Sequence, residues 1–173
     1  EARLGIDMAP RHVGNHELLG WIARSQGQFE ASIAHFQAAI DMAPPDPRTR
    51  SALASAYAAG GRRDEAVAIL RDLEGHSAGA AIPAEVFVTI HTALGNVGEA
   101  FAWLEGSAED RSISYFLFDL RYEPLYAPLR QDPRLARLFR SMGLDLGEAR
   151  YNSRLCPRTP PRPRTARSRR PTR

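Results

Sequence analysis

The chain contains no lysine, a single cysteine and no long apolar run. All 23 basic residues among its 173 are arginine. Because Cys156 stands alone, neither an internal disulfide nor a zinc site built from several cysteines can form within this chain. No stretch approaches the roughly 20 consecutive apolar residues that a membrane-spanning helix needs. The sequence therefore predicts no membrane-spanning helix and no membrane partner.

Acidic residues are missing from the C-terminal end, so the net charge of +3 hides a strong asymmetry. Residues 1–149 carry 14 arginines against all 20 acidic residues, a net charge of −6, whereas residues 150–173 carry nine arginines and no acidic residue. Arginine alternates there with proline, threonine and serine, a composition that cannot bury a core. We expect residues 147–173 to be a disordered tail. Residues 150–173 would attract phosphates in a salt-dependent way, so weak nonspecific nucleic-acid binding is one alternative function.

The sequence repeats itself with a period of 34 residues. Ile-Asp-Met-Ala-Pro at residues 6–10 recurs unchanged at residues 40–44, and the same displacement relates Gly27 to Gly61 and Gly61 to Gly95. A fixed period of this length indicates an array of short structural units.

Each repeated glycine separates two segments of helical pattern. Prolines are absent from residues 11–43, 48–82 and 84–123 and fall at the joints between these blocks. Apolar residues recur every three or four positions on both sides of each glycine, as in an amphipathic helix. Small residues at Gly20, Ala54, Ala66 and Ala100 would allow the two helices of each pair to approach closely. The sequence thus predicts an all-α chain of helix hairpins.

The pattern resembles the tetratricopeptide repeat, whose 34-residue unit has the spacing W-x2-L-G-x2-Y, then A-x3-F, then P. The corresponding residues of the three repeats are His16, Leu19, Gly20, Ala23, Ser32, Phe36 and Pro44, then Arg50, Leu53, Ala54, Tyr57, Ala66 and Leu70, then Ala84, Phe87, Val88, His91, Ala100 and Leu104. No repeat has the tryptophan, and the second and third lack the closing proline. Residues 11–108 would be three hairpins, and residues 1–10 the end of a preceding repeat. Since the chain begins with Glu1, we expect it to be part of a longer protein.

The resemblance implies a right-handed α-solenoid in which the first helices of the hairpins line a concave groove that binds a peptide or helix. When the three repeats are aligned with the family's repeat pattern, the groove residues would be Glu17, Trp21, Arg24, Arg48, Ser55, Glu85, Thr89 and Thr92, together with Ser25, Ser51, Ala59 and Ile82. Trp21 has two interpretations of about equal weight, an anchor for a partner or a contact with the preceding repeat.

Residues 109–146 are predicted to cap the last hairpin with an apolar cluster, an extended strap over residues 122–129 and a terminal helix. Asp132 followed by Pro133 indicates the helix start and Gly143 its end. Leu135, Leu138, Phe139 and Met142 would form its apolar stripe, and Arg134, Arg137 and Arg140 its opposite face. The segment 124–144 resembles the C-terminal end of bacterial multidomain regulators, in which an N-terminal winged-helix, cyclase-like or kinase domain precedes the repeats.

Groups that could support catalysis are sparse. His12 and His16 are one helical turn apart, but no third metal ligand follows them, so we expect no metal site and no cofactor. His91 takes the place of the family's packed tyrosine and is predicted to be a buried, neutral imidazole. Asp64, Glu65 and Glu99 begin second helices, where their charge complements the helix dipole.

The sequence therefore favours a non-catalytic protein-interaction module of a larger bacterial regulatory or signalling protein. Besides nucleic-acid binding, one more alternative is a regulatory array of an enzyme whose catalytic domain lies upstream of Glu1. The absence of a disulfide is compatible with the cytoplasm, which is the expected location.

Overall fold

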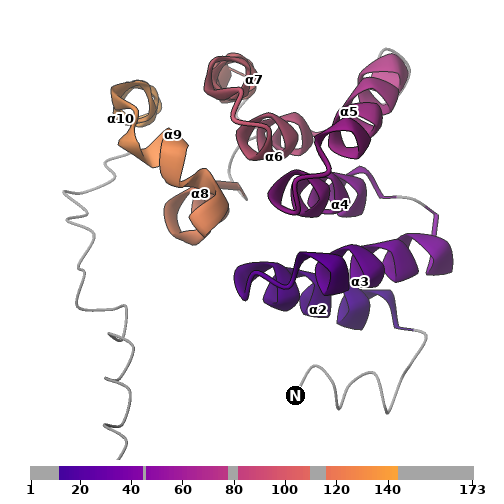
Figure 1. The fold of residues 1–173 in the computed structure, drawn as a ribbon. Helices are drawn as coiled ribbons and strands as arrows, with labels where there is room; N and C mark the ends of the chain where they lie inside the picture. The colour runs from indigo at the N-terminus through magenta and orange to yellow at the C-terminus, as the bar shows by residue number, and fades with distance from the viewer. Residues whose placement is uncertain (1–11, 45, 78–81, 110–115, 144–173) are drawn as a thin grey trace, which may run out of the picture.

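The computed structural model describes residues 12–44, 46–77, 82–109 and 116–143, which are helical apart from short connections (Figure 1). The helices are α2 (Val13–Ser25), α3 (Phe29–Met42), α4 (Pro47–Ala59), α5 (Arg63–Ser77), α6 (Ala84–Ala93), α7 (Val97–Glu109), α8 (Phe116–Tyr122), the 3-10 helix η2 (Pro124–Tyr126), α9 (Ala127–Gln131) and α10 (Pro133–Ser141). Helices α2 to α7 form three consecutive hairpins, as the period predicts, and α8 to α10 lie on one side of this stack.

The three repeated glycines make the same turn at the same place in each hairpin. Gly27, Gly61 and Gly95 have φ angles of 73°, 80° and 76°, a left-handed conformation that favours glycine. After each of them, the next backbone N–H donates to a carbonyl five residues back at 2.8 Å, the 6→1 bond of a Schellman motif. These bonds join Gln28 to Ala23, Arg62 to Tyr57 and Asn96 to His91. The 34-residue period is thus also a period of backbone geometry.

Small residues bring the two helices of each hairpin together. A Cβ atom built on Gly20 would lie only 2.7 Å from the ring of Phe36, and the Ser32 hydroxyl donates to the Gly20 carbonyl at 2.8 Å. Ala54, Ala66 and Ala100 are fully buried at 0 % exposure. The contact at Gly20 confirms the predicted close approach there, and the three alanines are buried as that prediction requires.

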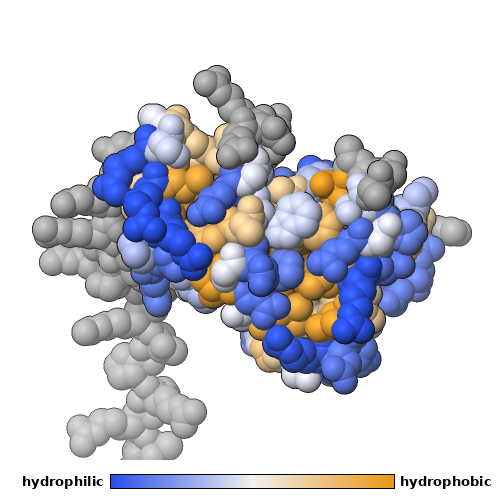
Figure 2. Space-filling model, turned by 90° about the horizontal axis from the view of Figure 1, so that it is seen from above, coloured by the Kyte–Doolittle hydropathy of each residue, from blue (hydrophilic) through white to orange (hydrophobic). Residues whose placement is uncertain are grey.

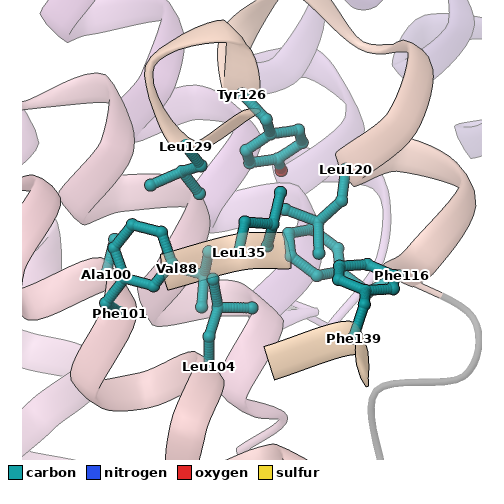
Figure 3. Packing of buried hydrophobic residues seen from close by; sticks show 10 residues of the cluster. All are labelled: Val88, Ala100, Phe101, Leu104, Phe116, Leu120, Tyr126, Leu129, Leu135 and Phe139. Carbon is teal, nitrogen blue, oxygen red and sulfur yellow. The ribbon is translucent and has the colours of Figure 1, made fainter. Parts of the chain in front are cut away.

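The third hairpin and the C-terminal helices share one hydrophobic cluster (Figure 3). Its ten buried members come from α6, α7, α8, η2, α9 and α10, and they are Val88, Ala100, Phe101, Leu104, Phe116, Leu120, Tyr126, Leu129, Leu135 and Phe139. The rings of Phe116 and Tyr126 meet edge to face, with centroids 4.9 Å apart. The C-terminal helices therefore cover the apolar face of the last hairpin, as a solenoid cap must.

The predicted extended strap over residues 122–129 is wrong, because this segment forms η2 and α9. Pro124 and Pro128 lie in the first turns of these two helices, where a missing N–H costs no hydrogen bond. Arg130 also donates from Nη1 to the carbonyls of Leu120 and Glu123, at 2.9 and 2.8 Å, and so satisfies the C-terminal end of α8. The short helices thus satisfy backbone hydrogen-bonding groups that an extended strap would leave without partners.

The last helix largely follows its prediction. The Asp132 carboxylate accepts from the backbone N–H of Arg134 at 2.9 Å as the N-cap, Leu135 and Phe139 are buried, and Gly143 has a φ of 72°. Arg134 differs from the expectation that it lies on the outer face. Its guanidinium carbon lies 4.1 Å from the ring centroid of Phe101 in α7, so this arginine fastens the cap to the array.

Several predicted segments lie outside the described residues, namely the repeat remnant at 1–10, part of the apolar cluster before α8 and the tail at 147–173. In the part of the chain that the structure does describe, no helix combines the length and the apolar character needed to cross a membrane.

Candidate functional site

The predicted groove residues lie on α2, α4 and α6, the first helices of the three hairpins. We call the side of the array that carries them the first-helix face. The eight residues differ widely in exposure: Arg48 is exposed, Glu17, Trp21, Arg24 and Glu85 are partly buried, and Ser55, Thr89 and Thr92 are buried. Only the first five of them therefore offer surface to another molecule.

The buried hydroxyl groups of this face are satisfied inside their own helices. Ser55 donates to the carbonyl of Ala52 and Thr92 to the carbonyl of Val88, both at 2.7 Å. Such bonds satisfy buried polar side chains locally. Ser55 and Thr92 are thus part of the packing of the array.

Trp21 packs within its own hairpin and carries an arginine beside it. Its ring meets the ring of Phe36 edge to face at 5.3 Å, and the guanidinium carbon of Arg24 lies 5.9 Å from the indole centroid. The side chain of Arg24 is only 11 % exposed, and burial lowers its pKa, an effect that the charge of Glu123 opposes. Trp21 and Arg24 form an aromatic and cationic pair at the end of α2.

Polar contacts connect the first helices to one another. Arg48 Nε donates to Glu85 Oε1 at 2.6 Å, a bond between α4 and α6 that raises the pKa of Arg48. The hydroxyl of Thr49 donates to the carboxylate of Glu17, which links α4 to α2. The two glutamates predicted for the groove therefore hold neighbouring hairpins in register.

The C-terminal helices reach the same face. The hydroxyl groups of Tyr126 and Thr89 lie 2.8 Å apart, and Arg24 Nη1 donates to Glu123 Oε1 at 3.4 Å. Tyr126 is 3 % exposed, and this burial raises its pKa. One short segment thus touches α6 through Thr89 and α2 through Arg24, so the chain itself covers part of the predicted groove.

Glu123 and Tyr126 are the site residues that the sequence reasoning missed. They belong to the predicted strap, and their local sequence, Tyr-Glu-Pro-Leu-Tyr, carries no repeat or motif signal. Their partners lie 99 and 37 residues away in the sequence. Only the three-dimensional path of the cap reveals these contacts.

Metal-ligating side chains do not cluster among the described residues. Nowhere in residues 12–44, 46–77, 82–109 and 116–143 do three or more His, Cys, Asp or Glu side chains come together as metal ligands. His91 is buried as predicted, burial lowers its pKa, and its Nδ1 has no hydrogen-bond partner in the described part. Burial therefore favours its neutral form, and the residue lies in the packed interior.

Seen from above, one face of the molecule shows hydrophobic patches between hydrophilic residues (Figure 2). The large apolar side chains that remain exposed among the described residues are Leu18, Ile22, Met42 and Tyr122. Leu18 and Ile22 share one side of α2, and Met42 ends α3. Leu18 and Ile22 therefore form a small exposed apolar strip on α2.

Comparison with known proteins supports the repeat interpretation. Residues 23–82 match the family model described as Tetratricopeptide repeat. Comparison with curated proteins and with solved structures finds no significant match. The matched region runs from the end of α2 to the start of the third hairpin and includes the turns at Gly27 and Gly61. The described hairpins are therefore an all-α tetratricopeptide repeat solenoid, with the family match itself at residues 23–82.

Proposed function

We propose that this chain is a non-catalytic protein-interaction module of a larger bacterial regulatory protein. Repeats of this family generally mediate contacts between proteins. The observation that carries the proposal is the pair of partly buried Trp21 and Arg24 on α2, together with exposed Arg48 on α4. A rigid aromatic side chain with an arginine beside it is a common composition for a binding hot spot.

The binding surface in this proposal is the half of the first-helix face that α2 and α4 form. The half near α6 is covered by the cap, as the contact between Thr89 and Tyr126 indicates. A peptide or short helix of another protein would lie along α2 and α4 and contact Trp21 and Arg48. The nucleic-acid alternative depends on residues 150–173, outside the described residues, and gains no support from the family match.

The proposal is tested with peptides selected by display on the intact chain. We expect the double substitution Trp21→Ala and Arg48→Ala to weaken the binding of the selected peptides by at least about tenfold. Truncating a hot-spot side chain costs roughly 2 kcal/mol or more of binding free energy. Affinity is measured by titration calorimetry and the fold by far-ultraviolet circular dichroism. Arg48→Ala alone tests the same surface with a residue whose side chain is 61 % exposed and whose removal breaks only the ion pair with Glu85.

The matched control is Met42→Ala together with Arg71→Ala, which also removes one large apolar side chain and one arginine. Met42 is 39 % exposed at the end of α3 and Arg71 is exposed on α5, so both lie on second helices and not on α2, α4 or α6. Peptide affinity should be unchanged in this control. If the wild type, the groove variant and the control all bound the selected peptides with equal affinity, the assignment of the binding surface to α2 and α4 would be refuted.

A further inference from the structure

Helix α6 is buried over most of its length. All seven residues from 86 to 92 are buried, and the helix packs against α4, α5, α7 and η2. One of these seven residues, His91, has a side chain that takes up a proton near neutral pH. A charged imidazole at this position therefore has no exposed face of the helix to turn towards.

The imidazole of His91 has no place for a second N–H group. The residue is 6 % exposed, and its Nδ1 is buried without a hydrogen-bond partner among the described residues. The backbone of His91 is fixed as well, because its carbonyl accepts from the N–H of Asn96 at 2.8 Å. A neutral ring can keep Nδ1 unprotonated, whereas an imidazolium makes it a buried donor without an acceptor. Protonation of the folded chain is therefore costly.

Two carboxylates oppose this cost without removing it. Glu74 in α5 and Glu99 in α7 carry negative charges that favour the imidazolium, and so does the last turn of α6, in which His91 lies. Burial outweighs these charges, so the pKa of His91 is lower than that of an ordinary histidine. The unfolded chain then binds the proton more tightly than the folded chain. Stability is complete above the ordinary pKa of about 6.5 and is lost as the pH falls from there through the lowered pKa.

The period of 34 residues confines this acid sensitivity to one hairpin. Ala23 and Tyr57 hold the position of His91 in the first and second hairpins, and their carbonyls accept the same Schellman bond at 2.8 Å. Neither side chain titrates near neutral pH. The third hairpin is also the one that holds the cap, through the ten-residue cluster of Figure 3 and through the contact of Thr89 with Tyr126.

We propose that His91 is an acid-sensitive switch of the third hairpin: when its imidazole takes up a second proton from water, α6 loosens from α5 and α7, and the cap releases the first-helix face. At neutral pH and above, the ring is neutral and the hairpin is closed. The inference concerns the array itself and does not depend on the proposed function. It makes the covering of the groove at α6 dependent on pH.

The test compares two equivalent backbone amides in the full chain by NMR hydrogen exchange at pH 7.5 and pH 5.5. The N–H of Asn96 donates to His91 in the third hairpin, and the N–H of Arg62 donates to Tyr57 in the second, both at 2.8 Å. Protection factors are used because they already contain the intrinsic pH dependence of exchange. Between the two pH values, protection of Asn96 should fall about threefold to tenfold more than that of Arg62, since a histidine that is kept neutral costs up to about tenfold per pH unit below 6.5.

Three variants make the outcome specific to the buried imidazole. His91→Tyr places the residue of the second hairpin at this position and should abolish the difference between the two amides. The matched control is His76→Gln, which removes an imidazole that is 70 % exposed on α5 and should leave the difference unchanged. Glu74→Gln removes a charge that favours the imidazolium and should enlarge the difference.

Two further measurements on the unsubstituted chain keep the proposal testable if His91→Tyr does not fold. The ring signals of His91 should titrate below pH 6.5, and protection of the Tyr126 amide, which donates to the Glu123 carbonyl at 3.1 Å, should fall together with that of Asn96. Titration of His91 at pH 6.5 or above, or equal losses at Asn96 and Arg62, would overturn the switch. Full protection of Tyr126 at pH 5.5 would overturn the release of the cap.

Discussion

Replacing Phe101 with alanine is expected to lower the free energy of unfolding by about 3–5 kcal/mol, the usual cost of deleting a fully buried aromatic ring. Phe101 is 1 % exposed and belongs to the cluster that joins the third hairpin to the cap. The guanidinium group of Arg134 also lies over its ring. The substitution therefore removes a contact that both parts of the molecule share. Chemical denaturation followed by circular dichroism measures the loss.

The control for Phe101→Ala is Leu18→Ala. Leu18 is a large apolar residue that is 51 % exposed, so its truncation should cost less than about 1 kcal/mol. A similar loss in both variants would mean that the cap does not share a core with the array.

Gly20→Ala is expected to destabilise the first hairpin by about 1–3 kcal/mol, the range typical of overpacking a buried contact. The added Cβ would lie 2.7 to 2.9 Å from three atoms of the Phe36 ring, which is itself 0 % exposed and has little room to move. The shift would also strain the bond from Ser32 to the Gly20 carbonyl. Thermal unfolding of the variant measures the effect.

The same substitution should have the opposite effect on stability at Gly75. This glycine lies in α5, and a Cβ built there meets nothing within 4 Å. Gly75→Ala should therefore stabilise the chain by up to about 1 kcal/mol, because alanine favours the helix. If both alanines had the same effect, close helix contact at Gly20 would be disproved.

The hairpins could be predicted from the sequence because their determinants are local and periodic. Gly27, Gly61 and Gly95 take the same left-handed turn, Gly20 lies at a close helix contact, and Ala54 is fully buried. Each of these signals involves residues within one hairpin. A period of 34 then repeats the same solution three times.

The path of the cap could not be predicted, because the interactions that set it are distant in sequence. Prolines at 124 and 128 suggested an extended strap, yet both begin short helices. Arg134 appeared to belong to the outer face, yet it stacks on Phe101. In both cases the deciding partner is a residue that no local pattern identifies.

The candidate site was predicted in part. Alignment with the repeat pattern placed the predicted groove residues on the first helices of the hairpins. It could not show that Ser55, Thr89 and Thr92 are buried. Nor could it show that Glu123 and Tyr126 reach this face from the cap. Whether a groove residue is buried depends on the element that packs against the groove. Here that element is the C-terminal cap of the same chain.

The central claim is that the cap lies against the first-helix face and closes it at α6. Nuclear Overhauser contacts between the Thr89 methyl group and the Tyr126 ring test this most directly, since the hydroxyl groups of these residues are 2.8 Å apart. The account predicts that these contacts appear in the intact chain, together with contacts between the rings of Phe116 and Tyr126. Random-coil shifts for Tyr126 and no contact with Thr89, in a chain whose α6 is intact, would contradict it.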